Sequence, residues 1–75
     1  MKIKIRTFGS VAEILGTELD AEAIDTDSLI ASLYKSYRML EGRKLLIAVN
    51  NTVIQQNTAL QENDVVAIMP PYSGG

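Results

Sequence analysis

The sequence predicts a single α+β domain, in which a mixed sheet of about five short strands has one main helix packed across it. Three observations support this prediction. The chain has 75 residues, which is enough for one small core. Near its start apolar and polar residues alternate with a period of two, and an apolar stripe of helical spacing follows in its middle. Short apolar runs in the second half supply the remaining strands.

The first segment is predicted to be a strand followed by a short helix. Residues 2–8 alternate in polarity, which points their two isoleucines inward. Residues 10–13 fit a capping box, in which the Ser10 hydroxyl accepts from the Glu13 amide, so the helix is expected to begin there. Gly16 supplies the left-handed position that ends this helix.

Residues 17–23 alternate again and are predicted to form a half-buried strand with an acidic outer face. The outer positions hold Glu18, Asp20 and Glu22. Carboxylates in a row could bind Ca²⁺ or Mg²⁺, but those ions need oxygens that converge from several directions. An edge strand whose charges resist aggregation is the favoured interpretation, and no metal site is expected.

The main helix is predicted from an apolar stripe that recurs with helical spacing. Asp25 or Thr26 is expected to cap its start, and Ile24 to pack over Leu29 as a hydrophobic staple. Gly42 is expected to end it. The stripe consists of Leu29, Ile30, Leu33, Tyr34, Tyr37 and Leu40.

Four basic residues cluster around the exit of this helix. A solvated surface that favours the helix C-terminus is the favoured interpretation, because cations stabilise that end of the macrodipole. Contact with an acidic partner surface is the alternative. The four residues are Lys35, Arg38, Arg43 and Lys44.

Three more strands are predicted in the second half of the chain. Two asparagines, residues 50–51, tolerate left-handed backbone and are expected to turn the chain between the first two strands. Residues 55–63 should form a loop that places Leu60 in the core, with Asn63 at a positive φ. The three strands are residues 45–49, 53–54 and 65–69.

The order of strands and helices is that of a β-grasp, with the first and last strands adjacent at the centre of the sheet. This domain is expected to cover residues 1–69, and residues 70–75 are expected to form an extended C-terminal tail. Pro70 and Pro71 would stiffen the exit of the tail, and its two final glycines are slim enough for a narrow channel. We favour a spacer that presents a carboxylate to another protein over a frayed terminus.

The composition excludes several classes of function. The chain has no Cys, His or Trp, which excludes disulfides, thiolate metal sites, thiol nucleophiles and His-based triads. Its net charge of -2 argues against nucleic acid as a partner. No apolar run is long enough to cross a bilayer, so a cytoplasmic protein without a membrane partner is expected. A carrier, subunit or binding module is favoured over an independent enzyme.

Several segments together resemble the small subunits of molybdopterin synthase, which are ubiquitin-like sulfur carriers of the MoaD/ThiS type. The resemblance covers nearly the whole chain, from Phe8-Gly9 and the short helix through Glu13 and Gly16 to the C-terminus. Its most specific parts are Ala48-Val49-Asn50, the segment of residues 60–67, and Pro70-Pro71-x-Ser73-Gly74-Gly75.

The resemblance implies a mechanism centred on the terminal Gly74-Gly75 pair. An adenylating partner enzyme would use ATP to activate the Gly75 carboxylate, and sulfur would then replace oxygen to give a thiocarboxylate. The tail would insert into the large synthase subunit and donate sulfur to cyclic pyranopterin monophosphate. The resemblance further implies a heterotetramer, no bound cofactor, and catalytic groups that belong to the large subunit.

The resemblance also implies which residues contact the partner enzymes. Val53 and Met69 match family positions that contact partners, while Phe8 is expected in the core. The tail residues Pro70, Pro71, Tyr72 and Ser73 complete the expected partner-binding set. Met69 stands where the family often has an aromatic residue, and Tyr72 where it usually has a small aliphatic one.

Three alternatives to this function remain. The chain could be a sulfur carrier for thiamine biosynthesis, although thiamine carriers typically lack the Pro-Pro stem. It could be a ubiquitin-like modifier that is conjugated to lysines. It could also be a β-grasp interaction module with an inert tail, in which case deletion of Gly75 would change nothing.

Overall fold

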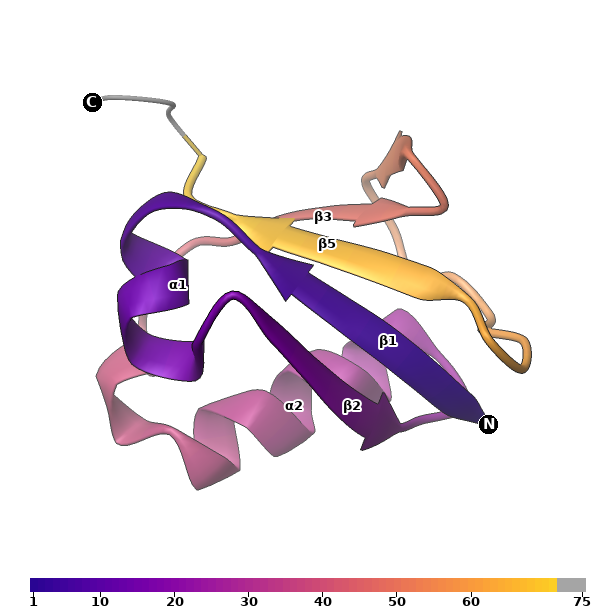
Figure 1. The fold of residues 1–75 in the computed structure, drawn as a ribbon, viewed down its shortest axis with the longest axis horizontal. Helices are drawn as coiled ribbons and strands as arrows, with labels where there is room; N and C mark the ends of the chain where they lie inside the picture. The colour runs from indigo at the N-terminus through magenta and orange to yellow at the C-terminus, as the bar shows by residue number, and fades with distance from the viewer. Residues whose placement is uncertain (72–75) are drawn as a thin grey trace.

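The computed structural model describes residues 1–71 and contains one mixed five-stranded sheet (Figure 1). The strand order is β2-β1-β5-β3-β4, with β1 and β5 parallel and the other pairs antiparallel. The predicted β-grasp, with first and last strands paired at the centre, is therefore confirmed. The elements in chain order are β1 (Lys2–Thr7), α1 (Gly9–Leu15), β2 (Glu18–Glu22), α2 (Thr26–Ser36), the 3-10 helix η1 (Arg38–Leu40), β3 (Leu46–Val49), β4 (Thr52–Ile54) and β5 (Val65–Met69).

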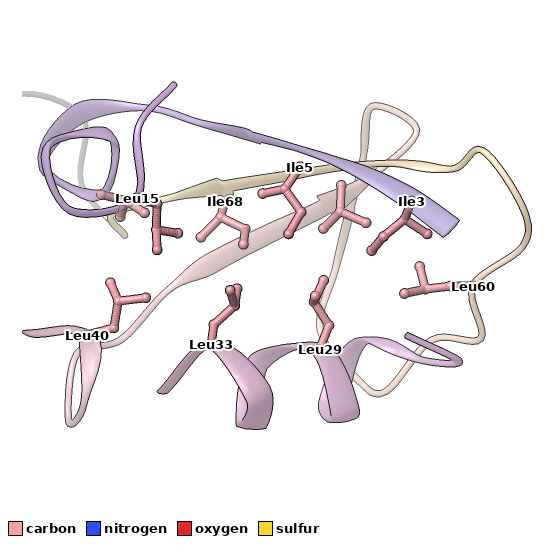
Figure 2. Packing of buried hydrophobic residues seen from close by; sticks show 10 residues of the cluster. Ile3, Ile5, Leu15, Leu29, Leu33, Leu40, Leu60 and Ile68 are labelled. Carbon is pink, nitrogen blue, oxygen red and sulfur yellow. The ribbon is translucent and has the colours of Figure 1, made fainter. Parts of the chain in front are cut away.

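The core lies between one face of the sheet and the helices (Figure 2). Leu29 and Leu33 point from α2 toward the sheet, where Ile5 is fully buried. Leu60 reaches the same core from the loop before β5, as predicted, and is 4% exposed. Within residues 1–71 no helix covers the opposite face of the sheet, which we call the open face.

Helix α1 begins two residues earlier than the predicted capping box at Ser10 requires. Its N-cap residue is Phe8, and no side chain caps it, so the expected Ser10 cap is wrong. The Phe8 amide instead donates to the Ile68 carbonyl at 3.1 Å, and Gly9 turns the chain with a φ of 59°. The start of the helix is thus set by the neighbouring strand. Gly16 ends the helix as predicted, with a φ of 86°.

Helix α2 is capped as predicted but is shorter than predicted. The Asp25 side chain accepts from the Ser28 amide at 2.8 Å, which satisfies a free donor of the first turn. Ile24 is 68% exposed, so the expected staple over Leu29 does not bury it.

The helix ends at Ser36 rather than near Gly42. Tyr37 is extended, and η1 then brings Leu40 into the core with no exposed surface. Leu40 is therefore buried from a 3-10 turn, which is tighter than a turn of α-helix.

The turn before β4 is tied to the start of β5. Asn50 and Asn51 have φ values of 50° and 72°, and Asn63 has a φ of 69°, as their predicted turn positions require. The Asn50 side chain donates to Asp64 at 2.9 Å and accepts from the Val65 amide at 3.0 Å. The hydrogen bond from the Asn50 side chain, and a second one that the Gln61 amide donates, lower the pKa of the Asp64 carboxyl.

The part of the chain that the structure covers includes no helix long and apolar enough to span a membrane.

Candidate functional site

The base of the C-terminal tail is fixed at the end of the central strand β5. After Met69 the chain continues into Pro70 and Pro71, beside helix α1 (Figure 1). A Cβ atom added at Gly9 would lie 3.0 Å from Cγ of Pro70, so the turn after β1 packs directly against this proline. The tail therefore starts from a packed position in the fold.

An apolar patch occupies the part of the open face beside the tail. In β5, Val66 and Ile68 point into the core, so Met69 points to the open face. Leu46 is the direct partner of Met69 on β3, and Val53 on β4 is the partner of Ala48 on the same face. We call Phe8, Leu46, Val53 and Met69 the open-face patch.

Phe8 belongs to this patch and not to the core. It follows the buried Thr7 and continues the pairing of β1 with β5 through its amide, so alternation points its ring to the open face. Its exposed fraction is 46%. The predicted burial of Phe8 is wrong, because the inward positions of β1 end at Thr7.

The other part of the open face is a ladder of opposite charges. The basic side chains of β1 stand directly opposite the acidic side chains of β2, and such cross-strand pairs stabilise a sheet. β2 is an edge strand, as its acidic pattern predicted. Within residues 1–71 no cluster of three or more acidic side chains is arranged to hold a metal ion. The pairs are Lys2 with Glu22, Lys4 with Asp20, and Arg6 with Glu18.

The structure brings together some of the predicted partner-binding residues. Val53 is 51% exposed, and Met69 is half-buried on the same face of the sheet. Pro70 is half-buried and Pro71 is exposed. The remaining predicted site residues, Tyr72, Ser73, Gly74 and Gly75, lie outside the described residues.

Leu46 belongs to the open-face patch but was not among the residues predicted to bind partners. It lies in a continuous apolar run, which does not reveal which residues face outward. Only its pairing with Met69 places it on the open face. Alternation along the strand indicates that Leu46 and Ala48 share a face, but it does not indicate which face that is.

Comparisons with known proteins agree with this geometry. Residues 5–75 match the model of the ThiS family. The chain is 34% identical to the molybdopterin synthase sulfur carrier subunit of Escherichia coli K12, over 97% of this chain and 99% of that one. A solved complex of subunits 1 and 2 of molybdopterin-converting factor from Helicobacter pylori contains a chain with 32% identity, complete mutual coverage and a TM-score of 0.76. The small archaeal modifier protein 1 of Methanosarcina acetivorans is 25% identical, with coverage of 99% and 96% and a TM-score of 0.81.

Proposed function

Since the chain belongs to the ThiS family, we propose that it is a sulfur carrier of molybdenum cofactor biosynthesis, working as the small subunit of a molybdopterin synthase. One structural observation carries the proposal. The tail leaves the fold at the end of β5, directly beside the open-face patch. A partner that buries the patch is therefore positioned to receive the tail.

In this function the chemistry takes place at the Gly75 carboxylate. A free carboxylate is a poor electrophile, so an adenylating partner first joins it to AMP and releases pyrophosphate from ATP. A sulfur donor then displaces AMP, which leaves a thiocarboxylate at Gly75. The thiocarboxylate sulfur then bonds to cyclic pyranopterin monophosphate, and water hydrolyses the resulting thioester, which frees the Gly75 carboxylate and leaves one sulfur of the dithiolene on the pterin.

The role of this chain is to bring the Gly75 carboxylate to the large subunit rather than to supply acid–base catalysis. It contains no His and no Cys, so the groups that move protons and bind the substrate phosphate belong to the large subunit. Pro70 and Pro71 limit the conformations that the tail loses on insertion. Gly74 leaves the backbone slim next to the reacting end. We place this function in the cytoplasm, in a heterotetramer, with no cofactor bound to this chain.

Reconstitution tests the proposal directly. The protein, an activating enzyme, ATP and a sulfur donor are combined with the large subunit and cyclic pyranopterin monophosphate, and molybdopterin is measured by mass spectrometry. We expect product with the full chain and none after deletion of Gly75, with folding unchanged. The intact mass should show exchange of oxygen for sulfur at Gly75. If a thiocarboxylated chain is supplied and molybdopterin does not form, this role is refuted.

Conjugation to proteins is a second candidate function. The similarity to an archaeal modifier protein favours it, since modifiers also act through a C-terminal carboxylate. Isopeptide-linked conjugates on other proteins, with no thiocarboxylate, would support this alternative. A thiocarboxylate that supplies thiazole synthesis but no dithiolene would instead indicate a thiamine carrier. If neither modification forms with activating enzyme and ATP, the tail is inert.

A further inference from the structure

The basic residues of this chain fall into two groups with different surroundings. The chain has seven Lys and Arg residues, and the three on β1 each stand opposite an acidic residue of β2. The other four lie between residues 35 and 44, a segment that contains one acidic residue, Glu41. In a protein with a net charge of -2, this segment is therefore a local basic surface.

Two of these four cations lie at the base of the tail. Arg43 and Lys44 line a hollow of about 220 Å³ together with Pro70 and Pro71. Both basic residues are exposed. The strand that follows them begins with Leu46, the partner of Met69, so the pair directly precedes a strand that carries part of the open-face patch.

The backbone that carries the pair is held in place. The Tyr34 hydroxyl donates to the Arg43 carbonyl at 2.7 Å, and the Arg43 amide donates to the Leu40 carbonyl at 3.0 Å. The Arg43 Nε atom donates to the Met39 carbonyl at 2.9 Å. That bond uses one of the five donors of a guanidinium group. The position of Arg43 relative to the tail is thus defined before any partner binds.

We propose that Arg43 and Lys44 pair with carboxylate side chains of the large subunit, at the rim of the channel that takes the tail. This inference rests on the proposed function. The four residues after Pro71 span at most about 14 Å when extended. When they extend into a channel, the two cations beside Pro71 remain at its entrance. Their counterpart is therefore an acidic rim rather than a phosphate at the site of sulfur transfer.

Charges at the edge of an interface act mainly on the association rate and its salt dependence. The test measures association of the large subunit with the wild type and with the double variant Arg43→Glu/Lys44→Glu, by stopped flow at low and high salt. Lys35→Glu/Arg38→Glu is the matched control, because it changes the net charge equally in the same segment but away from the hollow. Thermal unfolding of all variants checks the fold.

We expect the Arg43→Glu/Lys44→Glu variant to associate about tenfold more slowly at low salt. The difference should vanish near 1 M salt, where the Debye length is about 3 Å. The control should stay close to the wild type. Lys44→Glu alone, which leaves the hydrogen bond from Arg43 to Met39 in place, should give an intermediate rate.

Three results would overturn the inference: no slowing, equal slowing in the control, or slowing that persists at high salt. If the double variant has lost its fold, the Lys44→Glu variant alone decides the test, and a wild-type association rate in that variant also overturns the inference. Failure of the proposed function looks different, because the wild type would then neither bind the large subunit nor yield molybdopterin. If the wild type does both while charge reversal has no effect, only this inference is refuted.

Discussion

Replacing Phe8 by Ala should weaken binding of the large subunit without unfolding the protein. A phenylalanine buries about 200 Å² when fully covered. With 46% of its surface exposed, about 90 Å² of Phe8 is available to a partner. At about 25 cal/mol per Å², its burial contributes about 2 kcal/mol, which corresponds to a loss of about 10- to 40-fold in Kd.

Isothermal titration calorimetry with the large subunit measures this change. Ile24→Ala is the matched control, because Ile24 is 68% exposed but lies outside the open-face patch. It should leave Kd unchanged, and both variants should unfold close to the wild-type temperature. A Kd for Phe8→Ala within about threefold of the wild type, less than 1 kcal/mol, would refute the role of the patch. An equal loss in Ile24→Ala would refute it as well.

Three further predictions concern stability. Leu40→Ala should lower the free energy of unfolding by about 2–5 kcal/mol in urea titrations, because Leu40 is fully buried, whereas exposed Met39→Ala should change it by less than about 0.5 kcal/mol. The hydrogen bond from Asn50 lowers the pKa of Asp64, so this carboxylate stabilises the fold above the ordinary aspartate pKa of 3.8, and that contribution disappears as the pH falls through the lower folded value. Asp64→Asn should therefore flatten the loss of stability in acid, and an unchanged pH profile would contradict this reasoning. Gly9→Val should lower the melting temperature and slow sulfur transfer. A Cβ atom at this position would lie 3.0 Å from Cγ of Pro70, and the backbone of residue 9 has a φ of 59°, which a valine rarely adopts. A variant with wild-type melting temperature and transfer rate would show that this contact is unimportant.

Local patterns were sufficient to predict the strands and the face of the main helix. Alternation in residues 2–7 follows directly from one face being buried, and the stripe through Leu29 and Leu33 follows from one side of a helix being buried. The β-grasp then followed from the order of these elements. Contacts between distant segments could not be predicted in this way.

The errors at the ends of elements have tertiary causes. The Ser10 cap was a sound local signal, but the pairing of β1 with β5 continues to the Phe8 amide, which donates to the distant Ile68, and the helix begins directly after Phe8. The alternation of β1 therefore continues to Phe8, which places its ring on the open face. Helix α2 stops at Ser36, and Leu40 reaches the core from η1 instead. The apolar stripe continues through Leu40 and so gives no sign of this break.

The candidate site was predicted in part. Val53 and Met69 came from family resemblance, and the structure places both on the open face. Leu46 depended on the register between β3 and β5, which a continuous apolar run does not encode. The proximity of Arg43 and Lys44 to Pro71 likewise depends on how the loop after η1 returns to the sheet.

The parallel pairing of β1 with β5 links the proposed sulfur-carrier function to the joining of two distant parts of the chain. Lys4 pairs with Val65, so the centre of the sheet closes only after residues 65–69 have been made. Such a long-range closure is a slow step compared with forming a local hairpin. A chain that stops before residue 65 lacks the central strand and also the Gly75 carboxylate on which the proposed function depends. Under the proposed function, an activating enzyme that recognises the closed sheet would leave a chain that stops before β5 uncharged.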